Sequence, residues 1–462
     1  MTNVEAVILA AGRGSRMRSG LAKALHELGG IPLVQHVVRT VNAAGLGKPW
    51  IVVGYQGDRI EEALEGAGHF VTQPELHGTG DAVAIALRHL AAETEHVLVL
   101  VADCPLLPPE LLRDLVEQHL KSEAAATLVT TVMPDPTGYG RVVRNRDGTI
   151  AAIIEEREAA ETVRAIREVN TGIGIWRVDG LAEVLDRLPW HGEERYLTEA
   201  VQLLIAGGAT VDALVAPDPK RVMGINTRRE LAEAESILRR LTLDRLFEAG
   251  VTIVDPDSTY VDAEVEVGAD TVIYPMTFLR GRTKIGRECH IGPMATIVSS
   301  RLGDGVTVTQ SVVEQSVLAA NVHVGPFSHL RAGTYLDRDV YIGNFVELKN
   351  TRVGVGTKAG HHSYLGDATI GSRVNIGAGT VVVNYDGRTK HPTFIGNEAF
   401  IGCNANLVAP VEIGPGAYVA AGSTVTQNVP ADALAIARPR QENKPGWAKA
   451  RRSRPDGSSV GR

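Results

Sequence analysis

The clearest pattern in the chain is a sixfold hydrophobic repeat between Val267 and Val425, where an aliphatic residue followed by a small one, usually glycine, keeps returning. One inward aliphatic residue in every six is typical of a hexapeptide β-solenoid, in which each unit forms one face of a coil. A glycine-rich β-sandwich would instead alternate every second residue. The pattern therefore predicts a parallel β-helix. The clearest pairs are Ile285-Gly286 and Ile291-Gly292, Ile370-Gly371 and Ile376-Gly377, Ile395-Gly396 and Ile401-Gly402, and Ile413-Gly414 and Val419-Ala420.

A different pattern runs from Val4 to about Asn226, where short apolar runs alternate with amphipathic stretches. Such strand–helix alternation predicts an α/β doubly wound domain, with a mostly parallel sheet and helices on both faces. Ligands in these folds bind at the carboxyl ends of the strands. The apolar runs are 4–9, 51–53 and 97–101, and the amphipathic stretches include 81–92 and 110–120.

These patterns divide the chain into four predicted segments. Residues 1–226 form the α/β domain, and 227–250 form an amphipathic linker helix with Gly250 as its stop. Residues 251–438 form the β-helix, and 439–462 form a basic, flexible tail. The sixfold register lapses near 384–387, so we expect a loop to leave the coil there, and projecting loops often carry function.

Composition narrows the class of protein. The net charge of −7 argues against a general nucleic-acid binder, and no stretch approaches the ~20 apolar residues of a membrane helix. With no leader-like N-terminus, we expect a cytoplasmic protein. Its three cysteines, Cys104, Cys289 and Cys403, are too scattered for a disulfide framework or a zinc site.

The first predicted strand ends in a glycine loop, 9–17. Gly12 and Gly14 would let backbone N–H groups approach a phosphate, and Arg16 and Lys23 would add positive charge. Met17 replaces the third glycine of a dinucleotide fingerprint, and the Walker Gly-Lys-Ser/Thr is absent from the sequence. The loop either holds a triphosphate while its α-phosphorus is attacked, or is an ordinary βα turn.

Asp103 follows the apolar run 97–101, so we expect its carboxylate at the carboxyl end of a buried strand. Mg²⁺ takes few protein oxygens and fills its other positions with water and phosphate, so one such carboxylate and a second oxygen ligand suffice. Asp103 could equally cap the turn ahead of Pro105.

Further motifs follow in a fixed order, and together with the repeat they make the chain resemble one bacterial family. That family comprises the bifunctional N-acetylglucosamine-1-phosphate uridyltransferase/glucosamine-1-phosphate N-acetyltransferases, and the match covers residues from about 3 to 447. Its left-handed coil and its homotrimer with shared active sites are implied by this resemblance alone. The motifs are the glycine loop, Lys23, Gln73 with Gly78-Thr79, Asp103, the run 135–141, the run 169–172 and the run 224–226.

The resemblance implies roles in the α/β domain. Arg16 and Lys23 would act in catalysis, Asp103 and Asn226 would hold Mg²⁺, and Ala102 stands where the family usually has glycine. The residues implied to hold the nucleotide are Leu9, Ala10, Ala11, Gly12, Gln73, Gly78 and Thr79, and those implied to hold the sugar are Gly140, Glu155 and Asn170. The implied nucleotide-sugar site also includes Lys23, Val101, Ala102, Asp103 and Asn226.

In the solenoid the family motif reads as the run 358–364. Acetyl transfer to an amine needs a base with a pKa near the working pH, which histidine supplies. The spacing to Tyr364 and the resemblance select His361 over His362. The implied acceptor-binding residues are Arg331, Lys349, Tyr364 and Asn375, and the implied acetyl-CoA-binding residues are Ala378, Asn384, Tyr385, Cys403, Ala421 and Arg438. Cys403 replaces the family's usual serine, and a thiol is a weaker hydrogen-bond donor than a hydroxyl.

We therefore predict a bifunctional enzyme of UDP-N-acetylglucosamine synthesis, which feeds peptidoglycan and lipopolysaccharide. The solenoid would acetylate glucosamine 1-phosphate with acetyl-CoA, and the α/β domain would join the product to UTP with Mg²⁺. We expect no nucleic-acid or membrane partner. The alternatives are a nucleotidyltransferase with a regulatory solenoid, and a non-catalytic subunit of a translation-factor exchange complex. The second should have lost Arg16, Lys23 or Asp103, which are all present.

Overall fold

A computed structural model describes residues 3–452. The chain forms two compact units, and the first ends at Thr242 while the second begins at Leu243. The helix α8, Arg228–Glu248, carries the chain from one to the other, and Gly250 ends it with a positive φ of 83°. The predicted tail, 439–462, extends beyond the described residues. Within its described part, Trp447–Arg452 form helix α9.

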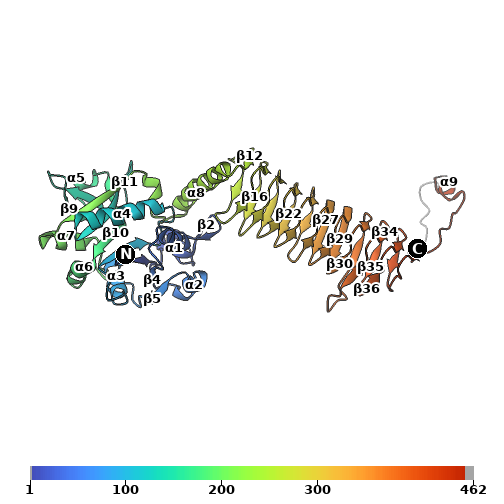
Figure 1. Ribbon diagram of the computed structural model, residues 1–462, viewed down its shortest axis with the longest axis horizontal. Helices are drawn as coiled ribbons and strands as arrows, with labels where there is room; N and C mark the ends of the chain where they lie inside the picture. The colour runs from blue at the N-terminus through green and yellow to red at the C-terminus, as the bar shows by residue number, and fades with distance from the viewer. Residues whose placement is uncertain (1–2, 453–462) are drawn as a thin grey trace. The chain divides into compact units, whose positions relative to one another are not determined.

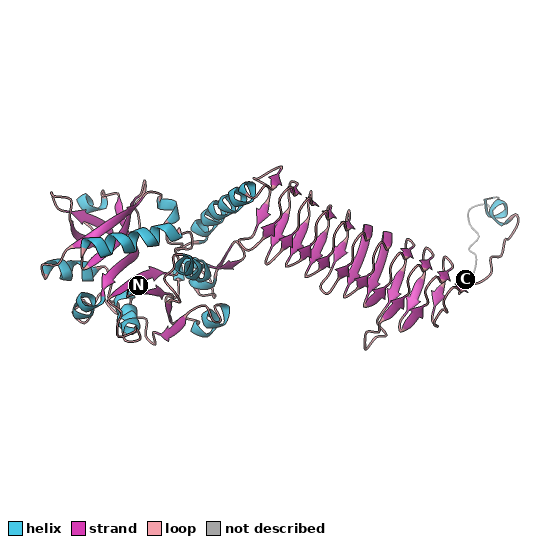
Figure 2. Ribbon diagram, in the orientation of Figure 1, coloured by secondary structure: helices cyan, strands magenta, loops and turns pink. Residues whose placement is uncertain are grey.

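The first unit is built on a mostly parallel sheet with helices on both faces, as predicted (Figure 2). Its strand order is β11-β7-β10-β6-β1-β4-β5, and β10 runs antiparallel to both of its neighbours. Successive side chains of a strand point to opposite faces. Ile8 therefore packs into the core beneath α1 and α4, while Val7 packs into the core beneath α3 and α6.

The elements of the first unit are strands β1 Val4–Leu9, β2 Glu27–Leu28, β3 Ile31–Pro32, β4 Trp50–Val53, β5 His69–Thr72, β6 His96–Val101, β7 Ala126–Val132, β8 Arg141–Arg144, β9 Ile150–Ile154, β10 Glu168–Arg177 and β11 Val211–Ala216, and helices α1 Leu33–Ala43, α2 Gly57–Ala63, α3 Thr79–Leu87, α4 Pro109–Ser122, α5 Glu161–Arg164, α6 Val178–Leu185 and α7 Glu199–Ala206, with short 3₁₀ turns at Ser15–Met17, Lys23–Leu25 and Pro219–Arg221.

The second unit is a β-helix with three faces (Figure 1), as the sixfold repeat predicted. Tyr260 pairs in parallel with Phe278, and Val272 with His290, so three hexapeptide units complete one coil. The repeated aliphatic residues fill the interior as continuous buried columns. Glycine follows them because the next coil lies too close for a side chain, since a Cβ on Gly286 would lie 2.7 Å from the Asp304 nitrogen.

The strands of its first face are β12 Thr252–Ile253, β15 Val272–Ile273, β18 His290–Ile291, β21 Thr307–Val308, β24 His323–Val324, β31 Asn375–Ile376, β34 Phe400–Ile401, β37 Tyr418–Val419 and β39 Leu434–Ala435; those of the second are β13 Tyr260–Val261, β16 Phe278–Arg280, β19 Thr296–Val298, β22 Val312–Glu314, β25 His329–Leu330, β32 Val381–Val383, β35 Asn406–Val408 and β38 Thr424–Val425; β27 Tyr341–Lys349 and β29 Lys358–Gly366 run through both. The third face comprises β14 Glu266–Val267, β17 Lys284–Ile285, β20 Arg301–Leu302, β23 Val317–Leu318, β26 Tyr335–Leu336, β28 Arg352–Val353, β30 Ala368–Ile370, β33 Thr393–Ile395 and β36 Val411–Ile413.

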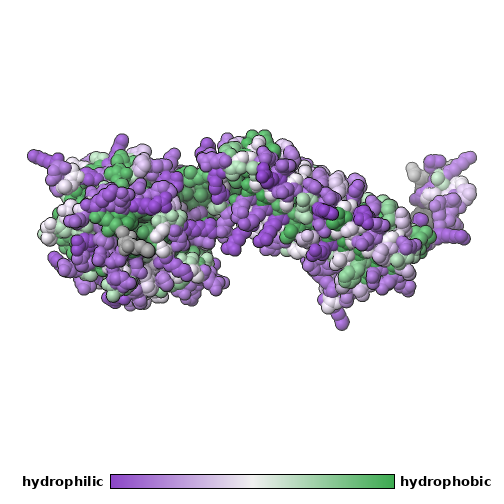
Figure 3. Space-filling model, in the orientation of Figure 1, coloured by the Kyte–Doolittle hydropathy of each residue, from purple (hydrophilic) through white to green (hydrophobic). Residues whose placement is uncertain are grey.

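The corner between the first and second faces carries exposed hydrophobic side chains, which we call the apolar ridge. It consists of Met276, Met294, Phe327 and Phe345, which are 47–56% exposed. The rings of Phe327 and Phe345 stack with centroids 5.5 Å apart. Figure 3 shows hydrophobic residues, in green, reaching the surface of this unit among hydrophilic ones. The ridge leads along the same corner to His361 and His362.

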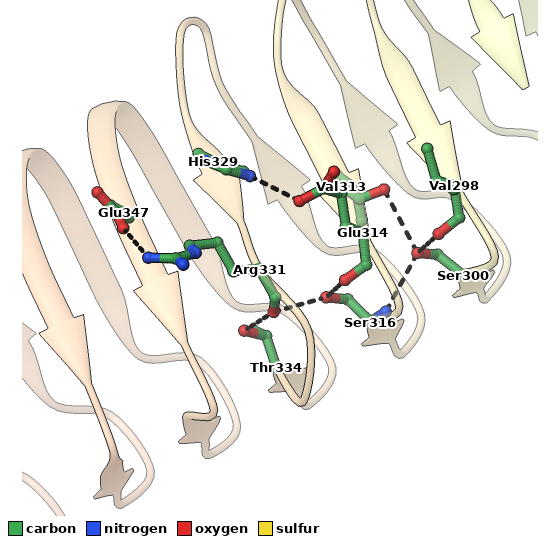
Figure 4. A network of polar contacts seen from close by, with 9 residues as sticks. All are labelled: Val298, Ser300, Val313, Glu314, Ser316, His329, Arg331, Thr334 and Glu347. Carbon is green, nitrogen blue, oxygen red and sulfur yellow. Dashed lines mark hydrogen bonds and ion pairs between the residues drawn. The ribbon is translucent and has the colours of Figure 1, made fainter. Parts of the chain in front are cut away.

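Small hydroxyl side chains satisfy backbone groups at the corner that follows the second face (Figure 4). The hydroxyl of Ser300 donates to the Val298 carbonyl at 2.8 Å and accepts from the Ser316 N–H at 3.1 Å. Buried polar groups need such partners, so this ladder fixes how the coils stack. Within residues 3–452, no helix combines the length and the apolar character that crossing a membrane would require.

Candidate active sites

A cavity of about 530 Å³ lies in the first unit at the carboxyl ends of β1 and β6. The glycine loop forms one wall, with Arg16 and Lys23 beside it. Every residue implied to hold the nucleotide lines this cavity: Leu9, Ala10, Ala11, Gly12, Gln73, Gly78 and Thr79. Other residues of the implied nucleotide-sugar site line it as well, namely Lys23, Val101, Ala102, Asp103 and Asn226.

Another wall of this nucleotide cavity contains Gln73, Gly78 and Thr79, and Gln73 is 3% exposed. Its amide donates to the Gly78 carbonyl at 3.1 Å and to the Asp81 carboxylate at 2.9 Å. Gly78 has a φ of 91°, and a Cβ there would lie 2.5 Å from the Arg195 carbonyl oxygen, so only glycine fits. Thr79 accepts the Leu197 N–H at 3.0 Å. This wall is therefore a rigid turn that leads into α3.

A second cavity, of about 320 Å³, opens beside the first and contains the residues implied for the sugar. Glu155 accepts a hydrogen bond from the Thr198 hydroxyl at 3.0 Å. Asn170 donates its backbone N–H to Gly140 at 2.9 Å, and β10 is irregular between Asn170 and Gly174. The buried Oδ1 of Asn170 finds no hydrogen-bond partner in the described chain.

Several other residues of this sugar cavity carry no sequence signal. They come from α7 and the segment before it, from the strand β7 and from the end of β10, and in the sequence they read as ordinary core or loop positions. They include Leu128, Trp176, Tyr196, Leu197, Thr198 and Val201.

The two cavities meet at charged residues. Arg16, Asp103 and Asn226 line both of them. The Lys23 ammonium forms an ion pair with Asp103 and donates to Asn226 Oδ1 at 3.0 Å, while Arg16 donates to the same oxygen at 2.8 Å. The junction thus combines two cations with two oxygen donors, as phosphate chemistry on Mg²⁺ requires.

The donor set at this junction fits magnesium. Asp103 and Asn226 offer a carboxylate and an amide oxygen that already share one cationic partner, Lys23. In the described part of the chain, no three His, Cys, Asp or Glu side chains gather as a metal-binding group. A metal on one or two protein oxygens, with phosphate completing its shell, is what Mg²⁺ favours.

Two further side chains near the junction are neutral. Burial raises the pKa of Tyr139, which lines the sugar cavity, to about 12, so its hydroxyl stays protonated. Burial also raises the pKa of the Cys104 thiol well above its usual range, and nearby Asp103 adds to the rise. The Cys104 thiol therefore fills space in the core and does not act as a nucleophile.

In the solenoid, His361 lies in the middle of β29 at the corner that carries the apolar ridge. Its Nδ1 lies 2.8 Å from Oδ1 of Asn344, the residue paired with it one coil earlier. Because an amide oxygen only accepts, Nδ1 carries the hydrogen and Nε2 presents its lone pair. The sequence reading did not include Asn344, although the coil register would have pointed to it.

Positive charge gathers around the end of β27, the strand that pairs with β29. Arg331 donates to Glu347 of the next coil at 3.0 Å (Figure 4). Hydrogen bonding and repulsion from Lys390 hold the pKa of Lys349 below its ordinary value, and Arg331 adds to this effect. A phosphate dianion would relieve such crowding of cations. Lys390 comes from the loop that leaves the coil, so sequence spacing could not place it here.

Two of the other implied acceptor and acetyl-CoA residues, Tyr364 and Asn384, lie against Gly366. A Cβ on Gly366 would lie 2.5 Å from the Tyr364 hydroxyl and 2.7 Å from the Asn384 amide nitrogen, so both side chains lie against it. Asn384 donates to Asp367 at 2.6 Å. Tyr385 begins the projecting loop and pairs with Lys390. Asn375, by contrast, is exposed on the first face, where it pairs with Lys358 of β29.

The other implied acetyl-CoA residues form a column. Ala378, Cys403 and Ala421 each stand two positions after strand residues that pair in register, namely Ile376, Ile401 and Val419. His361 occupies the same place one coil earlier, because Ala359 pairs with Ile376. Arg438 lies beside Gly422, next to Ala421. A long, thin ligand laid along this corner would end at His361.

Comparisons with known proteins agree with the fold assigned to each of the two units. Residues 6–169 match the family model described as a MobA-like NTP transferase domain, and residues 392–427 match the one described as bacterial transferase hexapeptide (six repeats). The chain is 45% identical over 444 residues to the "Bifunctional protein GlmU" of a Geobacillus species, covering 96% of this chain and 97% of that one. It is 45% identical to the protein of that name from Brevibacillus brevis (97% and 98% covered) and 41% identical to that from Streptococcus agalactiae (97% and 98%). A solved nucleotidyl transferase from Methanothermobacter thermautotroptrophicus aligns with 52% of this chain and 98% of its own, at 19% identity and a TM-score of 0.37, too low to carry an argument.

Proposed function

The chain belongs to the family of bifunctional GlmU proteins, and from this premise we propose how its two units divide the synthesis of UDP-N-acetylglucosamine. The chain is an enzyme with a uridyltransferase and an acetyltransferase activity. The observation that carries the division of labour is that two cavities of the first unit share Arg16, Asp103 and Asn226, while His361 heads an exposed column on the second.

In the first unit, the nucleotide cavity holds UTP and the sugar cavity holds N-acetylglucosamine 1-phosphate. The sugar phosphate oxygen attacks the α-phosphorus across the junction, a new P–O bond forms, and the bond to pyrophosphate breaks. Lys23 and Arg16 stabilise the charge that develops on the phosphate oxygens, because both already point to the junction.

Asp103 and Asn226 would hold Mg²⁺, whose contribution is to neutralise phosphate charge. The ammonium of Lys23, which pairs with Asp103 in the described structure, would then contact phosphate instead. Gln73 and Gly78 position the nucleotide side without taking part in the chemistry.

In the second unit, His361 Nε2 removes a proton from the amine of glucosamine 1-phosphate. The amine nitrogen then bonds to the acetyl carbon, and the thioester bond breaks to release coenzyme A, whose sulfur takes up a proton. Asn344 fixes the tautomer and the orientation of the base. Arg331, Lys349 and Lys390 bind the phosphate of the acceptor, and the column from Ala378 to Arg438 binds acetyl-CoA.

We assign a homotrimer to the chain, with the apolar ridge facing the other copies. A row of exposed Met and Phe side chains, in which Gln310 takes one position between Met294 and Phe327, marks an interaction surface. The ridge continues into the corner that carries His361, so a neighbouring copy would supply the missing wall of the acetyl-transfer site. Because both reactions use metabolites of the cell interior, we place the enzyme in the cytoplasm.

The test supplies glucosamine 1-phosphate, acetyl-CoA, UTP and Mg²⁺, and follows coenzyme A, pyrophosphate and UDP-N-acetylglucosamine separately. We expect all three products. A fragment of residues 1–240 should release pyrophosphate from UTP and N-acetylglucosamine 1-phosphate without acetylating the amine. A folded fragment that makes no UDP-sugar would refute the assignment of the first unit.

A further inference from the structure

The side-chain amide of Gln73, which follows β5 and lines the nucleotide cavity, is held in one orientation. Its nitrogen lies 3.1 Å from the Gly78 carbonyl oxygen and 2.9 Å from a carboxylate oxygen of Asp81. A carbonyl and a carboxylate only accept hydrogen bonds, so the two hydrogens of the amide must face them. The amide oxygen, Oε1, therefore points the other way.

This oxygen is left for a ligand. It accepts no hydrogen bond from residues 3–452, and it is not one of the fully buried, unpartnered side-chain atoms of that range. Oε1 therefore keeps accessible surface, although Gln73 as a whole is 3% exposed. The nucleotide cavity thus presents a hydrogen-bond acceptor whose direction the protein has fixed.

Gln73 lies at the end of the cavity that is remote from the phosphate chemistry. Asp103 follows β6, whereas Gln73 follows β5, and the strands β1 and β4 lie between them in the sheet. Adjacent strands are ~4.8 Å apart, so roughly 14 Å separates the two ends. Leu76 and Ala11 also line the cavity, and both lie within 3.0 Å of the position that a Cβ on Gly54, just after β4, would take. A nucleotide with its phosphates at the junction therefore places its flat, partly apolar base near Gln73.

The direction of Oε1 decides which pyrimidine fits. Uracil in a nucleotide has one N–H donor, at N3, whereas cytosine has an acceptor at N3. Oε1 can accept from the N3–H of uracil, but it opposes the lone pair of cytosine N3. Turning the amide over would suit cytosine, yet it would set Oε1 against the acceptor oxygens of Gly78 and Asp81. The residues behind Gln73 therefore control the choice.

We propose that Asp81 is a positioning residue for nucleotide selection, which holds the Gln73 amide with Oε1 toward the base and so favours UTP over CTP. Asp81 acts from behind, because it is not among the residues that line either cavity. Its other carboxylate oxygen accepts from the Arg195 guanidinium at 3.1 Å, and the two side chains are 18% and 17% exposed. This inference rests on the proposed uridylyl transfer in the first unit.

The test compares full-length Asp81→Asn with wild type. Asparagine keeps the shape of aspartate and replaces one acceptor by a donor. Arg195 still needs an acceptor, so the new amide should turn its oxygen to Arg195 and its nitrogen to Gln73. That nitrogen donates, and it therefore favours the turned-over Gln73 amide, whose own nitrogen faces the base.

The measurement is kcat/KM for UTP and for CTP, from pyrophosphate release at saturating N-acetylglucosamine 1-phosphate. In Asp81→Asn we expect the value for UTP to fall, the value for CTP to rise, and their ratio to fall about tenfold, the worth of roughly one hydrogen bond. The Gly78 carbonyl is unchanged and opposes a complete reversal. Acetylation by the same variant should equal that of wild type.

Two further variants serve as controls. Asp81→Ala removes the acceptor without adding a donor, so it should lower UTP use about threefold without raising CTP use. Asp179→Asn makes the same chemical change at a matched position. Asp179 also lies in the first turn of a helix and pairs with an arginine, Arg177, but it does not line either cavity. Its replacement should leave both values unchanged.

A gain in CTP use is a result that mere damage to the cavity does not produce. An unchanged UTP/CTP ratio in Asp81→Asn would overturn the inference, and so would a parallel fall for both nucleotides. Wild-type enzyme that releases no pyrophosphate from UTP and N-acetylglucosamine 1-phosphate would instead refute the proposed function. The two failures are thereby distinguishable.

Discussion

The two units build their sites in opposite ways. In the first, loops from several strands converge on one edge of a sheet, and the key side chains are largely covered: those of Lys23 and Asp103 are 19% and 16% exposed. In the second, the repeat sets out residues in columns on an outer corner, and His361, Asn375 and Cys403 are all exposed. A sheet edge encloses a ligand by itself, whereas a convex corner offers only one wall.

This difference separates what each unit needs. The first unit has its two cavities within a single chain, so we expect its reaction to depend on the residues of that chain alone. The second unit presents its base, its cations and its column to the outside, so its reaction should depend on a second copy as well. The experiments below either break this contrast or sharpen it.

The largest effect should come from His361→Ala. Loss of a general base costs about 10²–10⁴-fold in rate, and acetylation should fall by that much while uridylyl transfer continues. Raising the pH should restore part of the loss, because more of the acceptor amine is then neutral. Both half-reactions are followed by separate assays of coenzyme A and pyrophosphate.

His362→Ala is the control for that experiment. His362 lies next to His361 at the same corner, with a φ of 37°, and its backbone carbonyl accepts the Gly379 N–H. Its replacement should be mild. An intolerant His362 together with a tolerant His361 would place the base one residue further along the chain.

Asp103→Ala should have the reverse selectivity. The variant loses a Mg²⁺ ligand and the ion-pair partner of Lys23, so uridylyl transfer should fall about 10²–10³-fold while acetylation is spared. Asp179→Ala, which removes an exposed carboxylate paired with Arg177, is the control. Near-normal uridylyl transfer by the Asp103 variant would remove the metal role.

The contrast between the units also explains how far the sequence could predict them. Each solenoid unit contacts only its neighbours, so the repeat alone predicts the coil, its buried columns and the place where the loop departs. The sheet of the first unit depends on distant pairing, and no local pattern reveals that β10 runs antiparallel. Its apolar runs read the same in either direction.

The same distinction between local patterns and distant pairing decides which site residues could be predicted. Asp103 could be found from the sequence because it follows a buried apolar run, and Gly78 because it belongs to a motif of the family that the chain resembles. Asn344 and Lys390 could not, because each acquires its role from a neighbour distant in sequence, His361 and Lys349 respectively.

A smaller effect on the reaction rate, confined to acetylation in the second unit, should follow from substitutions in the apolar ridge. Replacing Phe327 and Phe345 by serine should weaken self-association, since truncating a central interface residue costs about 2 kcal/mol, or roughly 30-fold, each. Sedimentation should then show smaller species, with acetylation reduced and uridylyl transfer intact. Phe394→Ser, on the third face and 48% exposed, is the control. A wild-type chain that sediments as a monomer would refute the shared site.

The smallest effect, and the one most particular to this chain, concerns Cys403. It is the exposed member of the three cysteines, whereas Cys104 and Cys289 are buried. It stands in the acetyl-CoA column between Ala378 and Ala421. A hydroxyl donates more strongly than a thiol, so Cys403→Ser should leave the affinity for acetyl-CoA unchanged or raise it by at most about tenfold, the worth of one hydrogen bond.

The same position should make acetylation, and not uridylyl transfer, sensitive to alkylating reagents. An adduct on Cys403 would fill the corner along which coenzyme A lies, and bound coenzyme A should in turn protect the thiol. Mass spectrometry of the alkylated protein measures both effects, with the buried Cys104 and Cys289 as internal controls in the same sample. Equal labelling of Cys403 with and without coenzyme A would mean that the ligand does not cover it, and the column would then have to lie along another corner of the coil.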